Sequence, residues 1–153
     1  MTDFDEWPVQ VGLDSNRMLE HVGPFAQDAV RRNGLLWPCG VGVTVSGELE
    51  PFMVGDNFPT LEDAFNFMIA NLIADRDHWR AVCCAVAVTR PDGGDALNFT
   101  VEHATGQCFV ATMPYYRTRV LRQIAFEELS VIATKPLIWS WQDGTDILDD
   151  VGE

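Results

Sequence analysis

The sequence predicts a single α+β domain, in which an antiparallel sheet of about five strands carries helices mainly on one face. A chain of 153 residues fits one domain with its own core. Hydrophobic residues make up 47% and charged residues 22%, as in ordinary globular proteins. Periodic segments follow one another as helix, two strands, helix, three strands, helix. We therefore expect an acidic N-terminal segment at 1–13, the domain at 14–142 and an acidic tail at 143–153.

The first helical pattern covers about residues 14–33, as one broken helix or two short ones. Asp14 or Ser15 suits the N-cap position, and Pro24 suits the first turn of a second segment. Asn33 and Gly34 then form a helix stop. In the segment that follows, valines alternate with small residues, and "SGE" is a hairpin turn that leads into a second strand.

The stretch "TLEDAFNFMIANLIAD" is the clearest helix. Thr60 and Asp63 resemble a capping box at its start. Apolar residues then recur at helical spacing, namely Leu61, Phe65, Met68, Ile69, Leu72 and Ile73. Three strand-like runs follow, "RAVCCAVAVTR", "ALNFTVEHA" and "QCFVATM". The turn signals "PDGGD" and "TG" between them predict a meander of antiparallel hairpins.

A third helix is predicted over residues 117–134, because apolar residues there also recur at helical spacing. Pro136 ends any helix before "LIWSW", which suits a short strand or an extended arm. In that run Leu137, Trp139 and Trp141 alternate with the residues between them and would share one face.

Cys83 and Cys84 lie next to each other in the third predicted strand. Neighbouring side chains of a strand point to opposite faces, so this pair could neither chelate a metal jointly nor form an undistorted disulfide. We interpret both as structural thiols. The small face that includes Cys83 lets a helix approach closely, and we assign the Phe65 and Met68 side of the second helix to it. The valine face would then meet a second layer, a partner subunit or the C-terminal arm.

Charge and motif content exclude several classes of function. The net charge is −13, but eight of the acidic residues lie in the two terminal segments, where acidic tails are usually solvated. No basic stripe indicates a nucleic-acid partner, and no apolar run is long enough for a membrane span. The histidines and cysteines lack metal-ligand spacing, so neither a metal nor a cofactor is expected. Four irregularly spaced cysteines favour a reducing, cytoplasmic location.

Aromatic and arginine side chains near the C-terminal end indicate a protein interface, because these residue types dominate interface energetics. The candidate binding residues are Tyr115, Tyr116, Arg117, Trp139 and Trp141. We therefore expect a non-enzymatic binding module that acts through a protein partner or as a homodimer, for example an immunity or inhibitor-type protein with a basic target. The alternative interpretation of the two tryptophans is that they cap the core.

Two other classes remain open. A small enzyme would need Glu102, His103, Tyr115 and Arg117 around one pocket, although strand alternation sends Glu102 and His103 to opposite faces unless a bulge intervenes. A redox sensor would need one exposed thiol of low pKa.

Three strings, "LLWPCGVGVTVSGELEPF", "DALNFTVEHATGQ" and "VATMPYYR", resemble a group of small uncharacterised bacterial proteins over about residues 35–117. That group carries a Pro-Phe-Gly run, a Glu-His strand and a Pro-Tyr end; here Cys39 replaces its phenylalanine and Ser46 its hairpin aspartate. The resemblance implies a bacterial α+β protein, singles out Glu102, His103, Pro114 and Tyr115, and transfers no activity. The order of elements also resembles the profilin-like and roadblock-like folds and, more distantly, the small acidic secretion chaperones, so a secretion-type chaperone is a further alternative.

Overall fold

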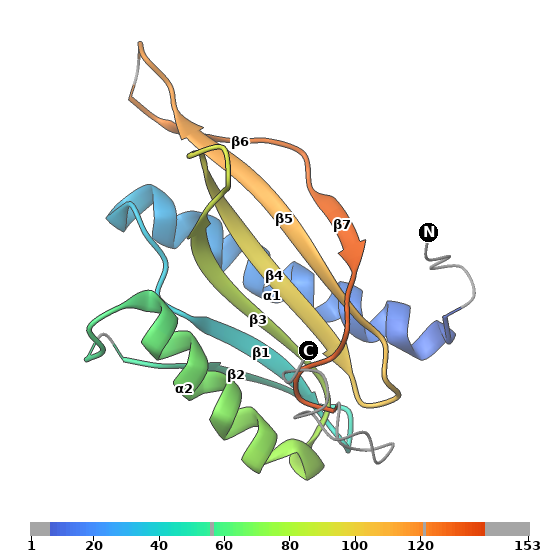
Figure 1. Ribbon diagram of the computed structural model, residues 1–153. Coiled ribbons are helices and arrows are strands. Elements are labelled where there is room, and N and C mark those ends of the chain that lie inside the picture. Colours follow the sequence, from blue (N-terminus) through green and yellow to red (C-terminus); the bar gives the residue numbers. More distant parts are fainter. Residues whose placement is uncertain (1–6, 56, 121, 140–153) are drawn as a thin grey trace.

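The computed structural model describes residues 7–55, 57–120 and 122–139 (Figure 1). These residues form two α-helices, a short 3-10 helix and seven strands. Their bounds are α1 Val9–Asn33, β1 Cys39–Thr44, β2 Leu49–Met53, α2 Leu61–Ala74, η2 Arg76–His78, β3 Trp79–Thr89, β4 Asp95–His103, β5 Cys108–Arg117, β6 Ile124–Phe126 and β7 Ser130–Ala133.

The strands form one curled antiparallel sheet in the order β2-β1-β3-β4-β5, and β6 and β7 both pair with β5. β6 lies against Tyr115–Arg117 of β5, and β7 lies against the Phe109–Thr112 segment. The predicted α+β class and the β3-β4-β5 meander are confirmed. The predicted strand count of five is wrong, because two more strands extend the sheet beyond β5.

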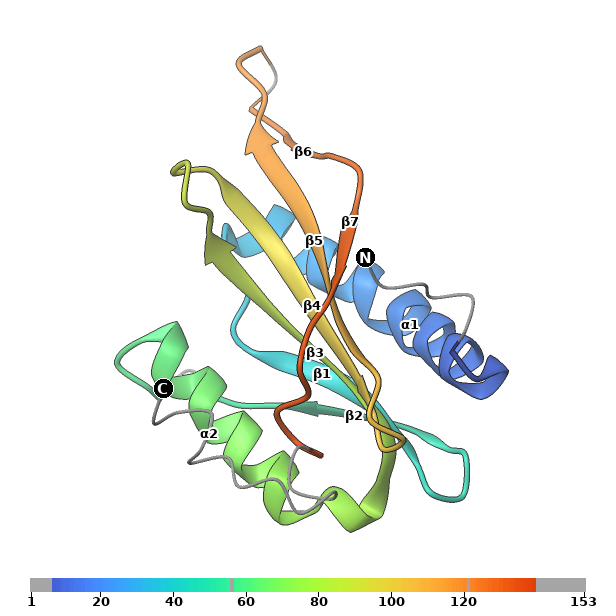
Figure 2. The ribbon, with the colours of Figure 1, turned by 45° about the vertical axis from the view of Figure 1, so that its right-hand side comes forward.

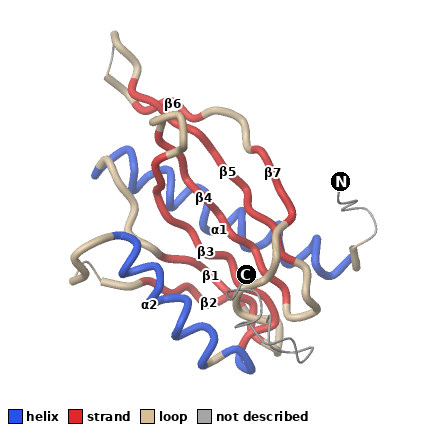
Figure 3. The backbone as a smooth tube through the Cα atoms, in the orientation of Figure 1, coloured by secondary structure: helices blue, strands red, loops and turns tan. Residues whose placement is uncertain are grey.

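These two strands occupy the region for which the sequence predicts a third helix, so that prediction is wrong (Figure 3). The apolar residues of 117–134 recur at helical spacing, but an unpaired β5 edge would leave a row of backbone donors and acceptors without partners. Pairing with β6 and β7 gives many of these donors and acceptors a partner. Long-range hydrogen bonding therefore overrides a local pattern that a sequence window cannot weigh against it.

One helix covers each face of the sheet, with α1 behind it and α2 in front (Figures 1 and 2). The prediction that the helices lie mainly on one face is therefore wrong. Cys83 and its small neighbours in β3 pack against α1, where Val22 and Ala26 line the interface. Cys84 and Val82 pack on the opposite face against Met68 and Leu72 of α2. The two thiols do point to opposite faces, as predicted, but the small face receives α1 and not α2.

α1 is a single helix of 25 residues, longer than predicted. It begins at Val9, inside the predicted acidic segment, and runs through Pro24 without a break. Pro24 is exposed, while the buried residues Val22 and Ala26 on either side of it keep their contacts with the sheet. Tertiary packing thus offsets the backbone hydrogen bond that an internal proline removes. The helix ends as predicted, because Gly34 adopts a φ of 77° and donates its N–H to Val30 O at 2.8 Å.

α2 begins as predicted, with the Thr60 side chain accepting the Asp63 N–H at 3.0 Å. In the sheet beneath α2, any residue larger than glycine would clash at position 40. A Cβ on Gly40 would lie 2.1 Å from the Cys83 carbonyl oxygen and 2.7 Å from Phe52 Cζ. Glycine in β1 therefore lets β3 and the Phe52 ring come close beneath α2.

Candidate functional site

A cleft of about 600 Å³ lies along the part of β3 that extends beyond β1. That size is typical of a binding site. Its walls come from the loop after α1, the first turns of α2, the last residues of β3, the part of β4 up to Thr100 and one residue near the end of β5. The lining residues are Gly34, Leu35, Leu61, Glu62, Phe65, Val86, Ala87, Val88, Thr89, Asp95, Asn98, Thr100 and Tyr115.

The cleft exists because β3 is longer than its neighbour. β3 has 11 residues and β1 has 6, and their pairing ends at Cys39 opposite Ala85. Beyond Ala85, no strand in the described part of the chain pairs with β3 on its β1 side. On the other side, β3 stays paired with β4 as far as Thr89 opposite Asp95.

The backbone of Thr89 points toward this free edge. Ala87 N–H reaches Leu36 O at 3.5 Å on the β1 side, whereas Arg90 N–H donates to Gly94 O at 2.6 Å across the β3–β4 turn. Backbone groups alternate in direction along an antiparallel strand, so the N–H and C=O of Thr89 face the same way as those of Ala87. Thr89 therefore offers one donor and one acceptor at the edge.

The side chains of the cleft combine apolar walls with negative charge. Phe65 and Val88 are partly buried and present apolar surface, while Glu62 and Asp95 are exposed carboxylates at the rim. The Tyr115 ring is 8% exposed. Burial and the nearby Asp95 charge together raise the pKa of Tyr115, so its hydroxyl stays a neutral hydrogen-bonding group.

Of the predicted interface residues that the structure describes, only Tyr115 lines the cleft. Tyr116 and Arg117 are exposed where β5 leads into the hairpin with β6. Trp139 is 4% exposed and packs in the core beneath α2, so its ring presents little surface to a partner. Trp141 lies outside the described residues.

Glu102 anchors the C-terminal arm of the described chain. Its carboxylate is 1% exposed and accepts three consecutive backbone N–H groups, from Leu137 at 3.0 Å, Ile138 at 2.6 Å and Trp139 at 2.8 Å. Burial raises the pKa of Glu102, and the three hydrogen bonds oppose that rise. The alternation predicted for the arm is wrong, since Ile138 and Trp139 are both buried and Leu137 is 42% exposed. A bend turns successive N–H groups toward one carboxylate, which an extended strand cannot do.

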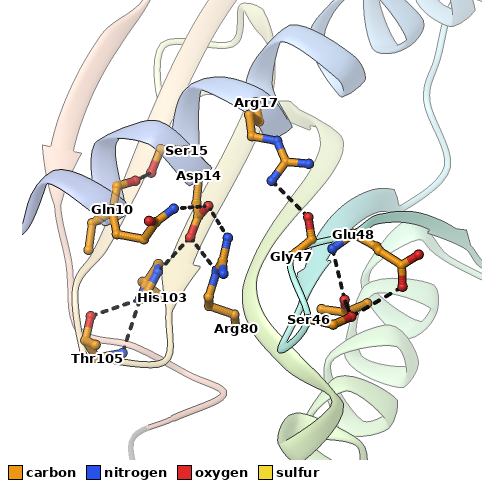
Figure 4. A network of polar contacts seen from close by, with 12 residues as sticks. Gln10, Asp14, Ser15, Arg17, Ser46, Gly47, Glu48, Arg80, His103 and Thr105 are labelled. Atoms are coloured by element: carbon orange, nitrogen blue, oxygen red, sulfur yellow. Dashed lines mark hydrogen bonds and ion pairs between the residues drawn. The ribbon is translucent and has the colours of Figure 1, made fainter.

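His103 lies on the other face of β4 and joins a buried polar network with α1 (Figure 4). Its Nε2 donates to Asp14 Oδ2 at 3.0 Å, because an ionised carboxylate can only accept a hydrogen bond. On the other side of the ring, Nδ1 lies 2.9 Å from Thr105 Oγ1 and 3.3 Å from the Thr105 backbone nitrogen. Arg80 donates to both oxygens of Asp14 at 2.9 Å, and Gln10 donates to Oδ1 at 2.8 Å.

Asp14 is therefore a structural anchor and not the predicted N-cap. Its carboxylate is fully buried and accepts two hydrogen bonds on each oxygen. Burial alone would raise the pKa of Asp14, but the hydrogen bonds from Arg80, Gln10 and His103 and the Arg80 charge hold it below 3.8.

The four residues of the enzyme alternative do not converge. Glu102 and His103 point to opposite faces of β4, as the alternation predicts. Glu102 is registered with Cys108, whereas Tyr115 is registered with Asp95, seven residues further along β4 and roughly 23 Å away. Arg117 lies beyond Tyr115 on β5.

The thiols give no sign of reactivity. All four cysteines are unpaired and buried. Burial raises the pKa of Cys39 and of Cys108 to about 11, and it raises those of Cys83 and Cys84 further. Neutral thiols are weak nucleophiles, so this environment does not suit a redox sensor.

The described residues contain no group of three metal-ligating side chains. None of the helices within them combines the length and apolarity needed to cross a bilayer. Comparisons with protein-family models, curated proteins and solved structures found no match. The profilin-like and roadblock-like resemblance and the resemblance to small bacterial proteins therefore remain predictions.

Sequence reasoning missed the cleft itself, including Thr89 and Asp95. One signal was present. The run "RAVCCAVAVTR" is almost twice as long as "CGVGVT", so part of it had to lack a partner on one side if the two paired. The sequence did not indicate that they pair, because β1 and β3 are separated by β2 and α2.

Proposed function

We propose that this protein is a non-enzymatic binding module whose cleft beside β3 takes an extended, basic segment of a protein partner. The main support for this proposal is the end of β3 that extends beyond β1, where Thr89 offers a backbone donor and acceptor inside a cleft with apolar walls. An exposed strand edge is the usual template for addition of a partner strand. Main-chain hydrogen bonds would hold the segment, and alternate side chains would enter the cleft.

Charge selects the kind of partner. Glu62 and Asp95 are the acidic side chains of the rim, and the chain as a whole has a net charge of −13. A segment with lysine or arginine at alternate positions places cations next to these carboxylates. The long-range field accelerates encounter with a basic protein, as an immunity or inhibitor-type role requires. The four unpaired cysteines support a cytoplasmic setting.

The test uses a library of eight-residue peptides displayed on phage and panned against the whole protein. We expect enrichment of basic, strand-forming sequences. Thr89→Pro removes the edge donor but no hydrogen bond to β4, because the Thr89 N–H faces away from that strand. The affinity of an enriched peptide should fall at least tenfold in Thr89→Pro.

Two controls define the result. Thr89→Val keeps the backbone donor, so its affinity for the enriched peptide should stay within about twofold of the wild type. Asp95→Asn removes a negative charge, so it should weaken binding of basic peptides most at low salt. Thermal unfolding confirms that each variant is folded. Failure to enrich peptides, or equal binding by both Thr89 variants, contradicts the proposal. Light scattering that shows a dimer disrupted by Thr89→Pro assigns the edge to a second copy of the chain instead.

A further inference from the structure

A second cavity, of about 500 Å³, is lined by three arginines and lies where the β5–β6 hairpin meets the end of α1. Figure 1 shows this hairpin projecting from one end of the sheet. The lining residues are Arg31, Arg117, Arg122, Gln123 and Ile124. We call this cavity the arginine pocket. It shares no lining residue with the cleft beside β3.

The three arginines are exposed, but the side chains of Arg31 and Arg117 and the backbone of Arg122 make contacts that position them. The Arg31 guanidinium lies 4.9 Å from the centre of the Phe126 ring, in a cation–π contact. Arg117 Nη1 donates to the backbone oxygen of Arg122 at 3.0 Å. Arg122 itself has a φ of 55°, which non-glycine residues seldom adopt. A strained backbone held by neighbouring contacts is more common at functional sites than elsewhere.

The positive charge of this pocket has no counter-charge in the lining. Among the residues that the structure describes, no carboxylate lines the pocket, although the whole chain contains 23 acidic residues. Within the described residues, the arginines that form ion pairs are Arg32, Arg80 and Arg90, and all three lie outside the pocket. Three like charges around one cavity repel one another, so an anion that enters relieves an unfavourable arrangement.

We propose that the arginine pocket binds the phosphate group of a small phosphorylated molecule. Guanidinium groups donate paired hydrogen bonds to phosphate oxygens, and three of them match a dianion better than a single carboxylate. A cavity of about 500 Å³ also leaves room for the organic part of the ligand. The Gln123 side chain at the wall adds an amide for a neutral polar group.

The test follows the arginine Nε–H signals of the full chain by NMR during titration with sodium phosphate, with chloride adjusted to keep the ionic strength constant. Phosphate should shift the signals of Arg31, Arg117 and Arg122 saturably. A parallel titration with sodium acetate asks whether a carboxylate suffices. We expect acetate to cause no saturable shift over the same concentration range.

Variants locate the site. Arg117→Gln and Arg122→Gly should each raise the apparent dissociation constant for phosphate at least tenfold, and glycine accepts the positive φ of residue 122. Arg32→Gln is the matched control, because it removes the same charge from an arginine that pairs with Asp28 and lies outside the pocket. Its affinity for phosphate should stay within about twofold of the wild type.

Three results would overturn the inference: no saturable shift with phosphate, an equal response to acetate, or the same loss of affinity in Arg32→Gln as in the pocket variants. None of them bears on peptide binding at β3, because the two sites have separate residues and separate probes.

Discussion

Asp14 shows how one side chain can connect three elements. It lies in α1 and accepts hydrogen bonds from Arg80 of β3 and His103 of β4. A buried carboxylate is tolerated only when its oxygens are fully paired, and here both are. The network therefore fixes the rotation of α1 over the sheet, because only one rotation brings Asp14 between these two donors.

Replacing this anchor should cost substantial stability. We expect Asp14→Asn to lower the free energy of unfolding at pH 7 by about 2–3 kcal/mol, less than for a fully buried pair because the Arg80 side chain keeps 29% exposure. The pKa of Asp14 is lowered in the folded protein, so the ionised carboxylate contributes its full stability above pH 3.8. This contribution is lost as the pH falls through the pKa that Asp14 has in the folded protein. Urea unfolding at pH 7 and pH 3 measures the difference.

The difference in the free energy of unfolding between wild type and Asp14→Asn should therefore be smaller at pH 3 than at pH 7. Asp28→Asn serves as the control, since its ion pair with Arg32 is exposed. It should change stability little at either pH. A gap for Asp14→Asn that is equally large at both pH values would contradict the role assigned to the ionised carboxylate.

At the scale of elements, β3 organises the molecule. Its small face receives α1 and its other face receives α2, and each face carries one of the adjacent cysteines. The alternation of side chains made this division of the thiols predictable. Which helix covers which face was not predictable, since both helices carry an apolar stripe and a local pattern holds no information about the partner.

The burial of the thiols has a measurable consequence. With a chromogenic disulfide reagent at pH 8, we expect all four cysteines to stay unreacted while the protein is folded. Their pKa values are raised by burial, to about 11 for Cys39 and Cys108, so thiolate is scarce and access is blocked. In concentrated urea all four should react at once. A rapid native reaction of even one thiol would revive the redox interpretation.

At the scale of the whole molecule, the sheet separates two cores. The larger core lies under α1, and the smaller one lies between α2, β3 and the C-terminal arm. Ile138 and Trp139 complete the smaller core, and Glu102 holds them there through the backbone. The arm thus covers part of the valine face for which the sequence left several occupants open.

We expect Glu102→Gln to loosen this arm. The glutamine amide cannot offer acceptors to all three N–H groups, and one buried donor left unpaired costs about 1–3 kcal/mol. Amide hydrogen exchange at residues 137–139 should become at least tenfold faster, while exchange within β3 changes little. The control is Glu20→Gln, which changes an exposed glutamate of α1 and should leave the exchange rates at residues 137–139 and in β3 unchanged.

The pH dependence of Glu102 has the opposite sign to that of Asp14. Because the pKa of Glu102 is raised in the folded protein, its contribution to stability is fully present below pH 4.5. The contribution falls as the pH rises through the pKa of Glu102 in the folded protein. Glu102→Gln removes this dependence. Unchanged exchange at 137–139 in the variant would show that side-chain packing alone holds the arm.

The sequence by itself determined the α+β class, both α-helices, the Gly34 stop, the Thr60 cap, the β3-β4-β5 meander and the opposite directions of Cys83 and Cys84. All of these depend on residues close together in the chain, where periodicity, capping and turn chemistry act. Tertiary structure decided the rest: the strands in place of a third helix, the helix on each face, the Asp14 network, the anchored arm and both cavities. These features arise from pairs of residues far apart in sequence, whose hydrogen bonds and burial outweigh local preference only once the chain is folded.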